Sequence, residues 1–393
     1  MKEKLAGHNN MMTFFRQFLK PKYETLNKIE IDAKKIIANF NYLKARQGSA
    51  EIFPVLKSNA YGHGLKEMCL IINHTSAPMV VVDSFPEAQI AWRFFKRKVL
   101  ILGEMPLDAY GYCDFKRTEF VVYNSETLEH LARYGKKAKI HLFVNSGMNR
   151  EGIKDISEFI NINKKYLDRV EVTGLCSHLA SADEKSILNQ SQEDTFLASL
   201  EVLRAAGYFP RWIHLGNSAG LLTLRNDLLT AYRPGLALYG YNPLSDSEDS
   251  RFEENSSLQP ALKVISQIVS VQKILPDESV SYNESYRVTS ETNIAVIPFG
   301  YFEGLDRRLS NKAEFLVFGL DSKKYAPIAG KVCMNLTCLD VNGQSISKGD
   351  KVVVISDKRE DRNSILNLAS LMNTIPYEVL VRLQPNIRRE IIW

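Results

Sequence analysis

The sequence predicts an α/β protein that begins with a TIM-type (β/α)8 barrel and ends in a mainly β domain. Three observations predict this fold. The length of 393 residues suggests two domains. The first part of the chain alternates short apolar runs with amphipathic stretches, as parallel β/α folds do. The last part contains closely spaced strand-like runs, which indicate a β domain.

Eight apolar runs in the first part predict strands. Helical patterns lie between several of them, such as Pro86–Arg93 and Ser125–Arg133, and Asp32–Lys44 precedes the first. Eight parallel strands with intervening helices predict a barrel whose active site lies at the carboxyl ends of the strands. The runs are Phe53–Lys57, Met79–Asp83, Val99–Gly103, Phe120–Tyr123, Ile140–Asn145, Val170–His178, Trp212–Leu215 and Leu236–Tyr239.

A change of composition marks the expected boundary between the domains. Residues 243–257 are rich in Ser, Asp, Glu and Asn and poor in apolar side chains. We therefore expect an N-terminal extension at residues 1–26, a barrel domain at 27–257 and a C-terminal β domain at 258–393. The second domain has strand-like runs at Leu262–Ile274, Ile294–Ile297, Ala313–Phe318, Pro327–Leu339 and Lys351–Ile355, and helical patterns at Ser364–Met372 and Tyr377–Leu383.

Composition disfavours several classes of function. The formal net charge of +5 is spread along the chain, with no Lys/Arg-rich stripe typical of nucleic-acid binding. The five cysteines are scattered and form no Cys-x-x-Cys pair, so we expect free thiols in a reducing compartment and no metal site. No apolar run is long enough to cross a membrane, and the apolar segment 11–15 is too short for a signal peptide. We expect a cytoplasmic protein.

Polar and glycine residues follow several of the predicted strands, and Lys57 is the most informative of them. A lysine at the end of a strand ordinarily reaches solvent. In a partly desolvated barrel mouth, its amine can instead form a covalent link with a carbonyl group. The segment that follows decides between these interpretations. Residues 57–64, Lys-Ser-Asn-Ala-Tyr-Gly-His-Gly, closely resemble the cofactor-lysine motif of the alanine racemase family.

The resemblance covers nearly the whole chain, from about Lys28 to Arg389. It implies an enzyme that depends on pyridoxal 5'-phosphate, with a barrel domain followed by a β domain. Each motif alone is weak, but their ordered series is specific. Segments similar to the family follow one another at Glu30–Asp32, Ser177–Asp183, His214–Gly220, Tyr232–Gly240, Val280–Tyr282, Gly300–Gly304, Gly330–Met334 and Ile375–Val379.

Racemisation explains why two bases are expected. A proton must leave the α-carbon on one face and return on the other, and one base cannot easily serve both faces. By resemblance, Lys57 serves one face, and Tyr282 from the partner subunit of a homodimer serves the other. His178 matches the histidine beside that tyrosine, where it would polarise the phenol. The plainer alternatives are an ordinary strand tyrosine and a structural histidine.

The resemblance also assigns residues to the cofactor. Arg233 resembles the arginine that faces the pyridine nitrogen, where its permanent charge would keep that nitrogen unprotonated and limit side reactions such as transamination. A rim salt bridge is the alternative for this arginine. Asn217 and Ser218 could equally form an ordinary helix N-cap. Residues expected to hold the cofactor, mainly through its phosphate, are Tyr61, Asn217, Ser218, Gly235, Leu236 and Tyr377.

Other positions match residues that contact the substrate. Arg150 matches an arginine near the cofactor's phenolic oxygen and the substrate carboxylate, and Met334 matches a residue whose backbone N–H binds that carboxylate. Asp183, Tyr301 and Arg307 are expected at the entrance to the site. For these residues, ordinary packing at the barrel rim is the alternative.

Four positions depart from the family pattern. Phe143 stands where many members have a carbamylated lysine that positions the arginine, so Arg150 must be oriented by another group. Asn335 and Glu303 stand where the family usually has aspartate, and Lys331 replaces an arginine. The changes leave the cofactor chemistry intact but bear on substrate preference.

The predicted function is therefore alanine racemase, which interconverts L-alanine and D-alanine and supplies D-alanine for peptidoglycan. One alternative is a racemase with another or a broader substrate range, for example serine. A second alternative is a non-catalytic regulatory protein that binds pyridoxal phosphate. Small proteins of that kind lack the second domain, so the region around Tyr282 argues against this alternative.

Overall fold

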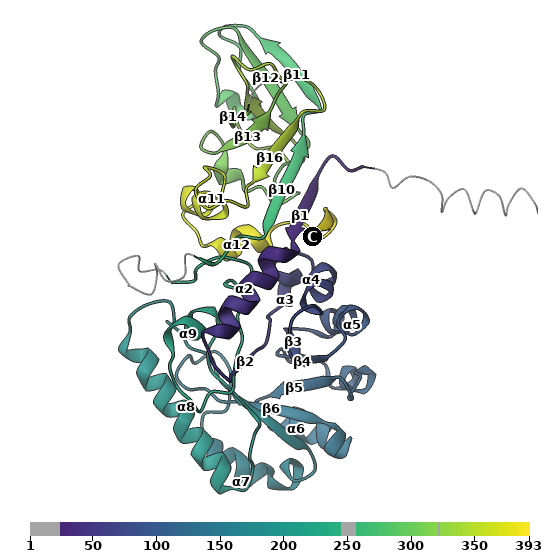
Figure 1. The fold of residues 1–393 in the computed structure, drawn as a ribbon, viewed down its shortest axis with the longest axis vertical. Coiled ribbons are helices and arrows are strands. Elements are labelled where there is room, and N and C mark those ends of the chain that lie inside the picture. Colours follow the sequence, from purple (N-terminus) through teal and green to yellow (C-terminus); the bar gives the residue numbers. More distant parts are fainter. Residues whose placement is uncertain (1–23, 245–256, 321–322) are drawn as a thin grey trace, which may run out of the picture.

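The computed structural model describes residues 24–244, 257–320 and 323–393. Most of the expected extension at 1–26 and most of the expected boundary at 243–257 lie outside the described residues. Figure 1 shows a barrel domain and an elongated β domain, with strand β1 (Lys28–Asp32) and the C-terminal end side by side between them.

The barrel is a ring of short parallel strands. Strands β3 to β8 pair in sequence order, and β2 pairs with β9, all in parallel. Backbone hydrogen bonds from Leu56 to Val81 and from Thr230 to Ile213 join these two groups into one ring. The predicted TIM-type barrel is confirmed. Its strands are β2 (Glu51–Ile52), β3 (Met79–Val82), β4 (Lys98–Ile101), β5 (Thr118–Val122), β6 (Lys139–Phe143), β7 (Glu171–Cys176), β8 (Trp212–His214) and β9 (Ala231–Tyr232).

The eighth predicted strand is wrong, and the first, Phe53–Lys57, is misplaced because it begins after β2 and ends in α3. Residues 236–239 form turns, and the eighth strand of the ring is the shorter β9. The side chains of Leu236–Tyr239 are buried although their backbone is not extended. A short apolar run shows burial but not the type of backbone, so its periodicity could not exclude a turn.

Helices cover the outside of the barrel (Figure 1). Local signals set several of their starts, since Asn124 and Asp155 each accept a backbone N–H three residues later and cap α6 and α7. The helical patterns in the first part are confirmed. These helices are α2 (Ala33–Ala45), α4 (Leu65–Ile72), α5 (Phe85–Phe94), α6 (Ser125–Ala132), α7 (Ile156–Leu167) and α8 (Ile187–Ala205). Two short elements lie at the mouth of the barrel instead, α3 (Lys57–Tyr61) and α9 (Ser218–Thr223).

The second domain is built mainly of antiparallel strands, as predicted. Its larger sheet has the order β14-β13-β16-β10-β1-β17, and β11, β12 and β15 form a smaller sheet. Strand β1 pairs with β10 and β17, so the start of the described chain belongs to this sheet. The elements are β10 (Leu262–Gln267), β11 (Ser270–Ile274), β12 (Thr292–Ile297), β13 (Glu314–Phe318), β14 (Lys323–Pro327), β15 (Thr337–Asp340), β16 (Lys351–Ile355), β17 (Arg388–Ile392), α11 (Ile365–Leu371) and α12 (Pro376–Val381).

Two predicted runs of this domain each divide into separate strands. Leu262–Ile274 is interrupted between β10 and β11, and Pro327–Leu339 consists of the end of β14, a loop and part of β15. The loop carries Gly330, whose φ of 84° favours glycine.

The second domain packs against the mouth of the barrel. A Cβ on Gly62, just after α3, would lie 2.2 Å from the backbone oxygen of Leu380 in α12. Nε of Arg389 donates a hydrogen bond of 2.9 Å to the same glycine's oxygen. Helix α12 therefore reaches the carboxyl ends of the barrel strands. Among residues 24–244, 257–320 and 323–393, no helix combines the length and apolar character that a membrane crossing needs.

Candidate active site

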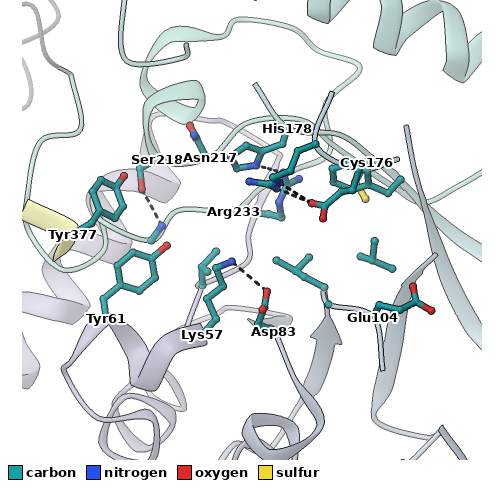
Figure 2. Close-up of a pocket in the computed structure, with 18 of the residues that line it drawn as sticks. Lys57, Tyr61, Asp83, Glu104, Cys176, His178, Asn217, Ser218, Arg233 and Tyr377 are labelled. Atoms are coloured by element: carbon teal, nitrogen blue, oxygen red, sulfur yellow. Dashed lines mark hydrogen bonds and ion pairs between the residues drawn. The ribbon is translucent and has the colours of Figure 1, made fainter. Parts of the chain in front are cut away.

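A cavity of about 630 Å³ opens at the carboxyl ends of the barrel strands. This size suits a small ligand. Its apolar part includes Val55, Leu102, Val121, Phe143 and Cys176. The structure brings most of the predicted cofactor residues together in its lining: Lys57, Tyr61, Arg150, His178, Asn217, Ser218, Arg233, Gly235 and Tyr377. Figure 2 labels all of these except Arg150 and Gly235.

Lys57 and Tyr61 reach this cavity from an unusual turn of backbone. The residues between them and Tyr61 itself have φ values of 51° to 55°, in the left-handed region. This conformation disfavours non-glycine residues by about 1–2 kcal/mol each. Such strain persists where the surrounding structure holds it, commonly at functional sites. The left-handed turn places the amine of Lys57 and the phenol of Tyr61 in one cavity.

Two carboxylates that the sequence analysis did not single out support this turn. Glu87 accepts the backbone N–H groups of Ser58 (2.6 Å) and Asp83 (2.9 Å). Nζ of Lys57 lies 3.2 Å from Oδ1 of Asp83, in the close-up of Figure 2. Asp83 ends a predicted barrel strand, where a carboxylate at the rim is a recognisable signal for a functional residue.

One part of the cavity, where the ring centroids of Tyr61 and Tyr377 lie 5.7 Å apart, carries hydrogen-bond donors. Burial raises the pKa of Tyr61 above its usual value and that of Tyr377 to about 12, so both phenols remain O–H donors at neutral pH. The backbone N–H groups of Gly235 (2.9 Å) and Ala237 (3.2 Å) donate to Ser218 Oγ, which holds this hydroxyl in place and leaves its own O–H as a donor. Neutral donors of this kind suit a phosphate group.

Gly235 makes room for this donor cluster. A Cβ at this position would lie 2.7 Å from the hydroxyl oxygen of Tyr61. Asn217 lines the cavity and is also the N-cap of α9, because its side chain accepts the backbone N–H of Gly220. Leu236 is buried and does not line the cavity. The cavity therefore fits a phosphorylated ligand with a carbonyl group that Lys57 can reach.

Arg233 and His178 form the polar wall of the cavity. Arg233 is buried, and its guanidinium donates to Nδ1 of His214 (2.5 Å) and to the backbone oxygen of Ser177 (2.6 Å). Nδ1 of His178 lies 3.5 Å from the same guanidinium. Burial and the positive charges of Arg233, Arg150 and Lys57 lower the pKa of His178 to about 3. The imidazole is therefore neutral at neutral pH.

Arg150 pairs with a carboxylate, although Phe143 replaces the lysine that orients this arginine in many family members. Its Nη2 and Nε lie 2.7 and 3.1 Å from Oε1 of Glu151. Phe143 lines the same cavity and offers no polar group to Arg150. The anionic partner of the arginine is therefore the next residue in the chain. Glu151 was missed as a site residue, although the sequence places an Arg-Glu pair at the predicted barrel rim.

Glu151→Gln is expected to raise the KM for the amino-acid substrate about 1.4- to fivefold, with a smaller change in kcat. An exposed arginine–carboxylate pair is worth about 0.2–1 kcal/mol, which corresponds to a factor of this size. Steady-state kinetics measure the effect, with Glu158→Gln on the exposed side of α7 as the control. An unchanged KM would exclude an orienting role for Glu151.

The predicted substrate and entrance residues of the second domain lie away from this cavity. Tyr282 and Met334 are 60% and 55% exposed. Tyr301 and Arg307 are also exposed. None of the four lines the cavity of its own chain. Tyr282 lies in a 3-10 turn, Tyr282–Glu284, rather than in a strand.

Hydrogen bonds join the segments that carry these side chains, and we call the exposed large side chains of these segments the tyrosine surface. Ser281 Oγ donates to the backbone oxygen of Lys331 (2.7 Å), and the backbone N–H of Phe302 donates to that of Met334 (2.8 Å). The tyrosine surface consists of Tyr282, Tyr301, Phe302, Met334 and Leu336. Asp183 lies on the barrel side instead, where its charge contributes to the raised pKa of Tyr377.

Two of the departures from the family pattern are partners of each other. Nδ2 of Asn335 donates to Oε1 of Glu303 (2.9 Å), and Oε2 of Glu303 accepts the backbone N–H of Gly300 (2.8 Å). An amide facing a carboxylate makes a hydrogen bond, whereas two carboxylates in this place would repel. The pair ties the loop that carries Met334 to the segment that begins at Gly300.

Asn335→Asp is expected to lower the free energy of unfolding by about 1–2 kcal/mol at neutral pH. The change removes a hydrogen bond and adds a repulsion of about 1 kcal/mol between like charges in a solvated setting. Denaturant unfolding measures it. The loss should shrink as the pH falls and one of the two carboxyl groups takes up a proton. A loss of equal size at pH 4 and pH 8 would contradict this pairing.

Comparison with known proteins identifies the family. The model of the alanine racemase N-terminal domain matches residues 31–243, and that of the C-terminal domain matches residues 261–391. The chain belongs to the alanine racemase family. Alanine racemase 2 of Caldanaerobacter subterraneus subsp. tengcongensis is 31% identical over 378 residues, which cover 93% of this chain and 95% of that protein. An alanine racemase of Helicobacter pylori is also 31% identical, over 92% of this chain and 97% of that protein.

Solved structures of alanine racemases share the fold. The enzyme from Bacillus anthracis with bound L-Ala-P superposes with a TM-score of 0.85 at 28% identity, covering 95% of this chain and 96% of that one. The enzyme from Streptomyces lavendulae has the same TM-score at 26% identity, with 95% and 98% covered. Both domains of this alanine racemase family member are therefore in the arrangement that the family shares.

Proposed function

We propose that this chain is an alanine racemase that depends on pyridoxal 5'-phosphate and interconverts L-alanine and D-alanine. The observation that carries the proposal is one cavity in which the amine of Lys57 faces a cluster of phosphate donors and a buried arginine. The family supports the same function, because both of its domain models match and the relatives named above are alanine racemases.

The residues of the cavity fit the cofactor. Lys57 would hold it covalently, and Tyr61, Tyr377 and Ser218 would hold its phosphate. Arg233 would face its ring nitrogen. When bound, pyridoxal phosphate withdraws electrons from the α-carbon of an amino acid and makes the α-hydrogen acidic. A permanently charged guanidinium keeps the facing nitrogen unprotonated, which limits this withdrawal and favours proton exchange over transamination.

Two bases of the protein would move the proton. The amine of Lys57 takes or returns the α-hydrogen on one face of the substrate. On the other face we assign this role to the phenol of Tyr282 from a second copy of the chain. The neutral imidazole of His178 polarises this phenol. Arg150 and the backbone N–H of Met334 would hold the substrate carboxylate, with Asp183, Tyr301 and Arg307 near the entrance.

A homodimer follows from this assignment. Tyr282 and Met334 are exposed on their own chain and lie outside its cavity, so only another copy can bring them to a substrate. Their tyrosine surface is apolar enough for such an interface. We also propose a cytoplasmic location and a supply of D-alanine to peptidoglycan. The five cysteines are free thiols, which is compatible with a reducing compartment.

The test is racemisation by the purified protein with pyridoxal phosphate. We expect L-alanine and D-alanine each to lose optical activity, L-serine to react far more slowly, and light scattering to give the mass of a dimer. Protein that binds the cofactor and racemises neither amino acid would refute the proposed function. Faster turnover of serine than alanine would move the assignment to another racemase.

A further inference from the structure

A line of buried polar side chains runs through the apolar interior of the barrel behind Arg233. Nε2 of His214 lies 2.7 Å from Nδ1 of His141, and Nε2 of His141 lies 2.9 Å from Oε2 of Glu119. Both histidines are 0% exposed and Glu119 is 1% exposed. Lys98 reaches the other carboxylate oxygen of Glu119 at 2.5 Å. We call Arg233, His214, His141 and Glu119 the barrel relay.

The barrel relay joins the two ends of the barrel. Glu119 is near the start of β5, His141 is in the middle of β6 and His214 ends β8, while Arg233 follows β9 at the cavity. Apart from Lys98 and Thr173, which contact Glu119, the neighbouring side chains are mainly apolar and include Phe53, Met79, Val81, Leu100 and Trp212. Buried ionic and polar groups lose more in desolvation than an apolar core would. Folding alone therefore gives little reason for these four residues.

The backbone leaves room for the relay. A Cβ on Gly174 of β7 would lie 2.3 Å from Nδ1 of His141, the atom that meets His214. Any larger residue at position 174 would displace this ring. Thr173, the preceding residue, donates its hydroxyl to Oε2 of Glu119 (2.8 Å). Strand β7 therefore accommodates the ring and supports the carboxylate.

The chemistry of these groups permits one arrangement of hydrogens. A carboxylate accepts only, so Nε2 of His141 carries the hydrogen and its Nδ1 accepts. His214 must then donate from Nε2, which leaves its own Nδ1 as an acceptor. A guanidinium only donates, and Arg233 donates to that Nδ1. With either histidine in the other tautomer, two N–H groups would face each other.

The electrostatic environment supports these protonation states. Burial opposes the ionisation of Glu119, but hydrogen bonds from His141, Lys98 and Thr173 hold its pKa below the usual range. Burial and the charge of Arg233 keep the pKa of His214 well below its usual value. The carboxylate is therefore ionised and His214 is neutral at neutral pH.

We propose that Glu119, through His141 and His214, is a positioning residue that fixes Arg233 as a donor at the cofactor cavity. The proposal rests on the proposed function in that Arg233 faces the cofactor nitrogen. The bonds to His214, Ser177 and Leu215 use Nη1 and Nη2 of Arg233, and among the described residues its Nε–H has no partner. The charge of Glu119 thus orders a donor at the opposite end of the barrel.

The first test reads the tautomers directly and needs no activity. The chain has seven histidines, so ¹⁵N-histidine NMR of the full-length protein gives few signals. Wild-type protein should show hydrogen on Nε2 and none on Nδ1 for both His141 and His214. Glu119→Gln should move at least one of them to the Nδ1–H tautomer or to a mixture, and Glu119→Asp should restore the wild-type pattern. A wild-type Nδ1–H form of either histidine would overturn the proposal, even if Glu119→Gln does not fold.

The second test reads the reaction outcome in holoenzyme. Transamination converts alanine and pyridoxal phosphate into pyruvate and pyridoxamine phosphate, so pyruvate per racemisation event measures how well Arg233 is held. We expect Glu119→Gln to raise this ratio about tenfold, the effect of losing one charge-assisted hydrogen bond. Glu171→Gln is the matched control, because Glu171 pairs with Lys139 at the same end of the barrel without joining the relay. Unchanged tautomers and an unchanged ratio would refute the relay, whereas absent racemisation in wild-type protein would refute only the proposed function.

Discussion

Replacing Lys57 with alanine is expected to lower kcat/KM for alanine by roughly 10⁴-fold or more, because one residue holds the cofactor and acts as a base. The visible absorbance of lysine-bound pyridoxal phosphate should also disappear. Lys57 is the amine that the left-handed turn delivers to the cavity, where its nearest ionic partner is Asp83. Optical rotation and an absorption spectrum of the purified variant measure both effects.

The control for this experiment is Lys66→Ala. Lys66 is an exposed lysine of α4, eight residues after the turn begins, so its loss leaves the cavity unchanged. Unfolding curves should show that Lys57→Ala is folded, since the removed side chain is partly exposed. Retention of the absorbance in Lys57→Ala would place the covalent link on another residue and contradict the assignment.

The barrel was predictable because most of its strands are short apolar runs followed by polar residues. The prediction failed at Leu236–Tyr239, where burial without extended backbone produces the same pattern. The left-handed turn after Lys57 was not predictable from propensity, because its central residues, 58–60, are not glycines. It depends on Glu87, whose carboxylate holds the backbone from a helix about 30 residues further along the chain.

The sequence did not reveal the contacts among Glu119, His141 and His214, because these residues are far apart in the chain. His141 meets His214 across 73 positions and Glu119 across 22, and no motif connects them. Only the closed ring of strands brings these side chains inside one barrel. The Arg150–Glu151 contact shows the opposite case, since its partners are adjacent in the chain. The adjacent arginine and glutamate are visible in the sequence. The side chains of adjacent residues often point in different directions, however, so their spacing alone did not predict a contact.

Tyr282→Phe is expected to slow racemisation by roughly 10²–10⁴-fold, the usual contribution of a general base, while the cofactor absorbance remains. The equilibrium constant between two enantiomers is one, so net racemisation must slow equally from both sides. Exchange of the α-hydrogen with solvent deuterium distinguishes the two bases. We predict that Tyr282 takes the α-hydrogen of L-alanine and that Lys57 takes that of D-alanine. Exchange from L-alanine should therefore fall by this factor, whereas exchange from D-alanine should persist because Lys57 is intact.

The position of Tyr282 also predicts that it acts in the site of a second subunit. Tyr282 is 60% exposed on its own chain and lies outside the cavity, so its effect on catalysis requires a second copy. Mixing Tyr282→Phe with Lys57→Ala subunits should therefore restore activity in those dimers that contain one intact site. Tyr112→Phe, another exposed tyrosine, is the control and should change neither exchange rate. Equal loss of exchange from both enantiomers, or no recovery on mixing, would contradict a base contributed by the partner subunit.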